Sequence, residues 1–421
     1  MSYLLGRNER FDMGGVCTHV YMEIVTHLNV EKLESSLNQV IQRHPMLRSI
    51  VDENGTQHLL EEVPYFSIKI RELTDMPYEI QQEIIINERE KMSHQLFKPN
   101  VWPLISIKGL KLDSSTHHLY IGFDMLIADG SSLQIIGNDW IHYYENPDEK
   151  LPSLDITFRD YMIGLEDFKQ SDLYEADKHY WLGRLEDFPA APALVFKQDP
   201  AAIGKPHFSR LSKTFSKEEW NHIKNVAQEI NVTPSSLLCT AYAEVLAYWS
   251  NQPDFAINLT VFNRYPFHQD VDRIIGDFTS VLLIEIDLSK SDDFVDRVRN
   301  IQKEILTALD HRHYDGVEFI RNIAARDGKI GEPVMPIVFT SMLSNNEDDP
   351  WSKIGETVMG LSQTPQVYLD HQAGEIGGEL LINWDYVNDI FDLHTIESMF
   401  DQYINILKYL IQIDMGDKNE D

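Results

Sequence analysis

Strand-like and helix-like segments alternate along this chain, and the alternation constrains its fold more than any single motif does. In the first half, a strand rich in β-branched and aromatic residues is predicted over 16–25, and an amphipathic helix over 29–41. A buried strand over 118–124 leads into a helix capped by Ser131 or Ser132. This order predicts an α/β fold with mixed sheets.

The second half repeats the same order of elements. Ser216 and Glu219 form a capping box that predicts the start of a helix, and Thr233 caps the helix after it. A strand is predicted over 334–343. An amphipathic helix over 398–413 ends the pattern, before an acidic tail that we expect to be frayed.

A proline-rich stretch separates the two halves. The chain has 421 residues, more than one hydrophobic core comfortably holds, and the prolines within 146–199 break regular structure. We therefore predict two lobes, residues 1–165 and 166–421. The abrupt start, Ser2 to Arg7, suggests a segment taken from a longer protein.

The charge of the chain excludes two classes of partner. With 36 Lys and Arg against 67 Asp and Glu, the formal net charge is −31, which repels nucleic-acid backbones and anionic lipid headgroups. No apolar run is long enough for a transmembrane helix, and no signal peptide is recognisable. We expect Cys17 and Cys239 to be buried and reduced, which indicates a cytoplasmic protein.

Motifs for several common chemistries are missing from the sequence. It contains no phosphate-binding glycine loop, dinucleotide fingerprint, His-Glu-x-x-His zinc motif or Gly-x-Ser-x-Gly nucleophile elbow. His117 and His118 begin a strand, where neighbours point to opposite faces. His311 and His313 have no third ligand at a suitable spacing. We therefore predict no metal site.

Asp124 and Asp129 flank the turn between a predicted strand and a predicted helix. From the residues alone, two interpretations stay open: a carboxylate pair for acid–base catalysis, or a structural element of the turn. A buried aspartate costs several kcal/mol unless it is paired. An arginine partner is therefore expected, and Arg43, Arg48 and Arg264 are the candidates.

Further residues able to move a proton lie in the second half. Thr340 and Ser341 interrupt an apolar strand, and because strand neighbours point in opposite directions, one hydroxyl is expected to face a cleft. The alternative for Thr340 is its strand propensity alone. Another strand is predicted over 362–370, closing with Asp370, which is either a turn residue or an acid placed for chemistry.

An ordered series of short segments resembles the motifs of heterocyclization domains of nonribosomal peptide synthetases, which are relatives of condensation domains. Asp124 and Asp129 stand where condensation domains carry His-His-x-x-x-Asp-Gly, and this replacement is typical of the heterocyclization subclass. The Phe-Pro-Leu-Thr start of the family's first motif is missing. The other matching segments span nearly the whole chain: 2–7, 43–47, 185–194, 233–249, 276–279, 336–343, 363–370 and Trp384-Asp385.

The resemblance implies two chloramphenicol-acetyltransferase-like lobes with mixed β-sheets, arranged in a V around a central tunnel. It also implies partners: a donor and an acceptor peptidyl carrier domain, and an adjacent adenylation domain in a larger synthetase. Substrates are carried on the phosphopantetheine arms of the carrier domains. No cofactor is expected to bind the domain directly.

The resemblance further implies a reaction. The amine of a carrier-bound Cys, Ser or Thr attacks an acyl or peptidyl thioester to form an amide. The side-chain thiol or hydroxyl then attacks the amide carbonyl, and loss of water gives a thiazoline or oxazoline. Thr340 and Asp370 match the residues that perform this cyclodehydration, with Asp370 as general acid–base.

The remaining residues singled out by the resemblance have supporting roles. Asp124 and Asp129 are expected to be mainly structural. The other residues expected to line or support the tunnel are Gln366, Ser341, Thr279 and Arg43.

Two other functions stay open at this point. One is a non-catalytic docking domain that keeps the fold, and the other is a condensation domain that forms only the amide. Thr340 and Asp370, together with the full series of motifs, favour heterocyclization.

Overall fold

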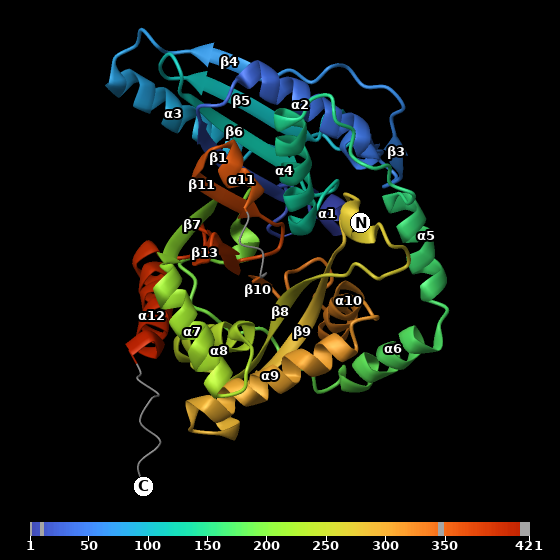
Figure 1. Ribbon diagram of the computed structural model, residues 1–421. Coiled ribbons are helices and arrows are strands. Elements are labelled where there is room, and N and C mark those ends of the chain that lie inside the picture. The colour runs from blue at the N-terminus through green and yellow to red at the C-terminus, as the bar shows by residue number, and fades with distance from the viewer. Residues whose placement is uncertain (1, 9–11, 344–348, 413–421) are drawn as a thin grey trace.

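Two mixed β-sheets, one above the other in Figure 1, form the framework of the molecule. The computed structural model describes residues 2–8, 12–343 and 349–412, so the predicted acidic tail lies outside the described residues. In Figure 1, helices α5 (Phe158–Phe168) and α6 (Asp172–Arg184) run down the right-hand side of the molecule, whereas the short helix α1 (Ser2–Leu5) lies nearer its middle. The predicted α/β class with mixed sheets is confirmed.

The first sheet has five strands. Helices α2 (Val30–Arg43), α4 (Gly130–Glu145) and α11 (Pro350–Ile354) pack together over it, whereas α3 (Tyr78–Ser93) packs against two of its strands, β6 and β1. A separate hairpin joins β2 (Ser49–Val51) and β3 (Gln57–Leu59). The spatial order of the strands is β11 (Glu356–Gln363), β1 (His19–Thr26), β6 (His117–Asp124), β5 (Ile105–Lys111) and β4 (Lys69–Glu72).

The second sheet has six strands and lies entirely within the second half of the chain. Its order is β7 (Phe208–Phe215), β13 (Glu379–Val387), β12 (Leu369–Ile376), β10 (Ile337–Met342), β8 (Asp254–Phe262) and β9 (Thr279–Asp287). The helices that pack around it are α7 (Lys217–Glu229), α8 (Pro234–Ser250), α9 (Phe294–Asp310), α10 (Gly316–Asp327) and α12 (Leu393–Gln412).

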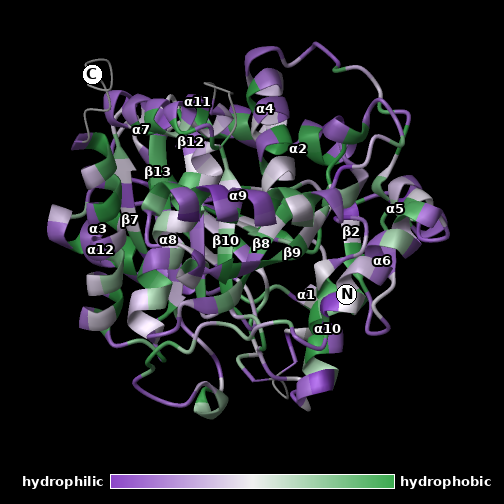
Figure 2. Cartoon of the chain, turned by 90° about the horizontal axis from the view of Figure 1, so that it is seen from below, coloured by the Kyte–Doolittle hydropathy of each residue, from purple (hydrophilic) through white to green (hydrophobic). Residues whose placement is uncertain are grey.

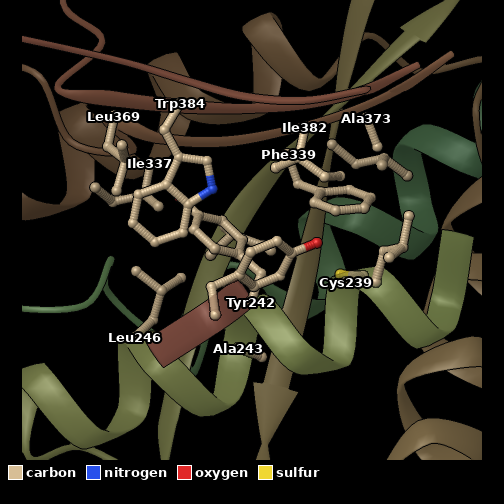
Figure 3. Close-up of a cluster of buried hydrophobic side chains, with 14 of the residues drawn as sticks. Cys239, Tyr242, Ala243, Leu246, Ile337, Phe339, Leu369, Ala373, Ile382 and Trp384 are labelled. Carbon is tan, nitrogen blue, oxygen red and sulfur yellow. The ribbon is translucent and has the colours of Figure 1, made fainter. Parts of the chain in front are cut away.

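Aromatic side chains fill the core between this sheet and α8. Figure 3 shows Tyr242 of α8 beneath Phe339 and Trp384 of the sheet, with its ring centroid 6.2 Å and 5.4 Å from theirs. Cys239 lies in the same layer. It and Cys17 are both buried and free, as predicted.

Hydropathy follows the layers of the fold. In Figure 2 the central strands β8 and β9 are mostly hydrophobic, whereas helices such as α5 and α9 carry both hydrophilic and hydrophobic residues. Among the residues that the structure describes, no helix combines the length and the hydropathy needed to cross a bilayer.

Strand β11 crosses from one half of the molecule to the other. It follows β10 in the chain but pairs with β1 of the first sheet, Gln363 lying opposite His19. The chain then returns to the second sheet at Leu369. The single strand predicted over 362–370 is therefore wrong, because Pro365 cannot donate to a ladder and Gln366 turns the backbone at φ 63°. The division into lobes 1–165 and 166–421 stays a prediction. Strand β11 crosses that division, because it belongs to the second half of the chain but completes the first sheet.

Capping side chains fix where the helices begin. Ser216 and Glu219 form the predicted capping box of α7, and Thr233 caps α8. The predicted cap of α4 at Ser131 or Ser132 is wrong. Asp129 accepts the hydrogen bond from the Ser132 N–H instead, because a carboxylate accepts from free N–H groups at the positive end of a helix.

A glycine on β6 makes room for a buried histidine on β1. A Cβ atom added to Gly122 would lie 2.6 Å from Nε2 of His19, which is 1% exposed. Burial lowers the pKa of His19 to about 3, so the ring is neutral. Since the imidazole is enclosed, it has little freedom to move aside.

We predict that Gly122→Ala lowers the free energy of unfolding by about 1–3 kcal/mol, because the new methyl group must displace this ring. Gly374→Ala on β12 is the matched control, since a Cβ there meets no atom within 4 Å. It should change stability by less than about 0.5 kcal/mol. Urea unfolding of both variants measures the difference, and equal losses would contradict the explanation.

Candidate active site

A cavity of about 950 Å³ lies between the two sheets. Strands β1 and β11 of the first sheet line it on one side, and strands of the second sheet line it on the other. Thr340, Asp370 and Thr279 are all among its lining residues. The structure thus brings together three of the residues selected from the sequence, although they come from three different strands.

Thr340 and Asp370 meet because β10 and β12 are parallel neighbours. The Thr340 hydroxyl lies 3.2 Å from Oδ1 of Asp370 and 2.8 Å from Oγ1 of Thr260 on β8. One hydroxyl donates a single proton, so when Asp370 is ionised the chain runs from Thr260 to Thr340 to the carboxylate. The hydroxyls of Thr260 and Thr340 therefore form a hydrogen-bonded chain that ends at Oδ1 of Asp370.

The second oxygen of Asp370 is held by an amide. Nε2 of Gln372 donates to Oδ2 at 2.7 Å. Removal from water raises the pKa of Asp370 to about 7; the nearby charge of Asp385 acts in the same direction, whereas the hydrogen bonds from Gln372 and Thr340 oppose it. A carboxyl with a pKa near neutrality can both give and take a proton at physiological pH.

Ser341 points away from this pair, as the alternation of a strand requires. Its hydroxyl lies 2.7 Å from that of Ser235 on α8. Ser341 is thus part of the contact between sheet and helix, and Thr340 is the hydroxyl of β10 that faces the cavity.

Asp124 is paired with an arginine that the sequence analysis did not consider. Nη2 of Arg7 lies 2.6 Å and 2.5 Å from its two oxygens, and the carboxylate is fully buried. Arg43 and Arg48 were wrong as partners: Arg43 binds Asp139, and Arg48 donates to backbone carbonyls. Burial raises the pKa of Asp124, and the charge of Arg7 opposes that rise.

Asp129 binds an arginine from the second half of the chain. Its Oδ1 accepts from Nη2 of Arg264 at 3.0 Å, and from the Ser132 backbone and hydroxyl at 2.6 Å each. Arg264 was one of the expected partners, and it also donates to the carbonyls of Val271 and Ile274. These contacts tie the β6–α4 turn to the chain after β8, which favours the structural interpretation of Asp129.

The remaining predicted residues lie in different places. Arg43 lines a second cavity of about 1170 Å³, formed by α2 and the residues before α5. Gln366 donates to the carbonyl of Gly331 at 3.0 Å, in the loop before β10. Thr279 lines the first cavity, and its N–H donates to Asp277 at 3.2 Å. Burial raises the pKa of Asp277, which the sequence analysis did not select, to about 7.

Three histidines of the two pairs, His118, His311 and His313, contact carboxylates within the fold. Nε2 of His118 lies 2.7 Å from the buried Glu23, and His311 and His313 both contact Asp177, at 2.9 Å and 2.7 Å. No group of metal-ligating side chains occurs within residues 2–8, 12–343 and 349–412.

Several residues of the site were missed from the sequence. Gln372 could have been found, because it lies two positions after Asp370 and so shares its face of the strand. In the sequence, Asp385 stands out only as part of the Trp384-Asp385 motif, and no pattern singles out Arg210. Their contacts with Gln372 come from strands far apart in the chain.

Comparison with known proteins identifies the family. The model of the condensation domain matches residues 15–414, which is nearly the whole chain. The chain belongs to the condensation-domain family. This condensation domain is 32% identical to the EpoB NRPS cyclization-docking bidomain from Sorangium cellulosum, with a TM-score of 0.90 over 98% of this chain and 83% of that one. The predicted resemblance to heterocyclization domains is confirmed.

Curated relatives of the domain are much longer proteins. It is 44% identical over 412 residues to bacitracin synthase 1 of Bacillus licheniformis, covering 97% of this chain and 8% of that protein. It is 30% identical over 401 residues to phenyloxazoline synthase MbtB of Mycobacterium sp. (strain MCS), covering 94% of this chain and 33% of that protein. The domain therefore spans a third or less of both relatives.

We predict that Arg7→Met lowers the free energy of unfolding by about 3–5 kcal/mol, because it leaves Asp124 buried without its partner. Arg299→Met is the control, since the pair of Arg299 with Asp296 is about half exposed at both ends. It should change stability by less than about 0.5 kcal/mol. Chemical denaturation measures both variants, and a small loss for Arg7→Met would show that the buried pair contributes little.

Proposed function

We propose that this domain performs heterocyclization in nonribosomal peptide synthesis. It joins a carrier-bound acyl or peptidyl thioester to a carrier-bound Cys, Ser or Thr, and then closes the new amide into a thiazoline or oxazoline. The observation that carries the proposal is the Thr340–Asp370 pair, which faces the cavity with a carboxyl pKa near neutrality. The names of EpoB, a cyclization bidomain, and of a phenyloxazoline synthase support it.

Amide formation needs little acid–base catalysis from the side chains of the site. A thioester is already activated and an amine is a good nucleophile, so holding the two in line supplies much of the acceleration. In this site Asp124, which occupies the position of a condensation histidine, is fully buried and paired with Arg7. We therefore assign it no proton transfer.

Ring closure needs a group that takes and returns protons. The thiol or hydroxyl forms a bond to the amide carbonyl carbon while the carbonyl oxygen takes the proton of the Asp370 carboxyl and becomes a hydroxyl, and the proton of the attacking thiol or hydroxyl passes to the resulting carboxylate. That hydroxyl leaves as water with a proton from Asp370, and the nitrogen loses its own proton to Asp370 as the C=N bond forms. The carboxyl of Asp370 is thereby restored, and one water is released.

Thr340 orients this carboxyl and extends its reach. Its hydroxyl is hydrogen-bonded to Oδ1 of Asp370 and to the hydroxyl of Thr260, so a proton can pass through Thr340 to the carboxylate.

The partners we propose are a donor and an acceptor peptidyl carrier domain, whose phosphopantetheine arms carry the substrates, and an adjacent adenylation domain. The same proposal places the reaction in the cytoplasm.

We predict that Asp370→Asn and Thr340→Ala abolish ring formation while the amide still forms, because only the second step needs this proton transfer. Uncyclised amide should accumulate on the acceptor carrier, heavier than the ring product by one water. Mass spectrometry of the loaded carriers measures this. Ser341→Ala is the matched control, since that neighbouring hydroxyl faces α8, and it should still form the ring.

The outcomes separate the competing functions. Unchanged ring formation in Asp370→Asn would overturn the assignment of the acid–base group. Amide without ring in the unmodified domain would indicate a condensation domain, and carrier binding without either product would indicate a docking domain.

We predict that Asp370→Asn is more stable than the unmodified domain above pH 7. The pKa of Asp370 is raised from about 3.9 in the unfolded chain to about 7 in the fold, so the folded state holds its proton more tightly. The stability contributed by this proton is complete below about pH 4 and is lost as the pH rises to 7. Asparagine does not ionise, so the difference should grow to about 2–4 kcal/mol at pH 8.

Denaturation at pH 4 and at pH 8 measures this difference. Asp401→Asn, on the exposed side of α12, is the control and should show less than about 0.5 kcal/mol at either pH. A constant difference between the two pH values would contradict the raised pKa of Asp370.

A further inference from the structure

The buried carboxylate of Asp385 lies behind the proposed catalytic carboxyl and takes no part in the steps above. It is 2% exposed and pairs with Arg210 of β7 through both oxygens, at 2.6 Å and 2.5 Å. Its Oδ2 also accepts from the backbone and the hydroxyl of Ser362, at 2.9 Å and 2.7 Å. These donors supply the hydrogen bonds that a buried carboxylate requires.

This ion pair decides which way Gln372 points. Nη2 of Arg210 can only donate, and it lies 3.2 Å from Oε1 of Gln372. The amide NH₂ must therefore face the other way, where it bonds Oδ2 of Asp370 at 2.7 Å and the hydroxyl of Ser362 at 2.7 Å. With the amide reversed, an oxygen would face the carboxylate and repel it.

The same contacts join the two sheets. Ser362 belongs to β11 of the first sheet, whereas Arg210, Gln372 and Asp385 belong to strands of the second. Gly360 of β11 leaves space for the guanidinium, because a Cβ there would lie 2.9 Å from Nη1 of Arg210. The network is thus complete only while β11 stays against the second sheet.

We propose that the Asp385–Arg210 ion pair is a positioning device for the ring-forming carboxyl: it orients Gln372 against Asp370 and balances the charge beside it. The inference rests on the proposed role of Asp370. Asp385 and Arg210 are positioning residues, since they act through Gln372 and through their charges.

The two members of the pair act on Asp370 in opposite directions. The negative charge of Asp385 raises the pKa of Asp370, and the positive charge of Arg210 lowers it. Among the described residues, Tyr242 on α8 and Tyr3 on α1 also interact with the charge of Asp370, and burial raises the pKa of both phenols, so they are neutral. Within the part of the chain that the structure describes, the charged groups that act most on Asp370 are the two members of this ion pair.

The test uses variants that break the same ion pair from either end. Asp385→Asn should lower the pKa of Asp370 and Arg210→Met should raise it, each by about half a unit or more. The double variant removes both charges and should return the pKa toward its original value. Carbon-13 labelling of aspartate, with the Asp370 signal assigned by its loss in Asp370→Asn, measures this pKa by NMR without any turnover.

Ring formation by the full domain with loaded carriers is the second readout. The pH profile of the ring-forming step should move down for Asp385→Asn and up for Arg210→Met, with amide formation changed less than about threefold. A structural role alone would damage both variants in the same way. Shifts of the same sign, or no shift, would overturn the proposal.

The result also separates this inference from the proposed function. If Asp370→Asn still forms the ring, the role of Asp370 fails even when the NMR shifts have opposite signs. If Asp370→Asn blocks the ring but the shifts do not oppose each other, only the positioning role fails. Should Arg210→Met not fold, the comparison of Asp385→Asn with the double variant decides, because the pKa must be lower in the former.

Discussion

The pairing of β11 with β1 is the constraint on which the rest of the site depends. A strand from the second half of the chain completes the first sheet, so the two sheets are fixed relative to each other by a backbone ladder. The cavity lies between them, and Ser362 at the end of β11 reaches Asp385 in the opposite sheet. Without this strand, the cavity would lose one wall and the carboxyl network would lose its link to that wall.

Buried arginine–carboxylate pairs reinforce the same arrangement. Asp124, Asp129 and Asp385 each bind an arginine more than a hundred residues away in the chain. Pairs of this kind add little net stability, since both charges lose their hydration, but breaking one leaves a charge alone in the interior. They therefore contribute mainly to the specificity of the fold, because a wrong packing of the two halves would leave several buried charges without partners.

The sequence predicts local structure well and long-range pairing poorly. The capping residues Ser216 and Thr233 were identified correctly, because a cap and its helix are neighbours in the chain. Thr340 and Asp370 were selected as a site, and the structure places them in contact, yet no periodicity indicates that β10 and β12 are adjacent. Arg7 as partner of Asp124 and the crossing of β11 depend on the tertiary fold, which a pattern of residue types does not encode.

The exchanged strand also bears on how such domains can be recombined. A chimera joined between the halves, near residue 165, would combine the first four strands of one sheet with a fifth strand from another parent. The β11 strand of the other parent would have to pair with β1 with the same register shift between Glu23 and Ile24. It would also need a small residue at the position of Gly360, where the guanidinium of Arg210 lies close to the backbone. Evolution and engineering can therefore exchange this domain more readily as a whole than by halves.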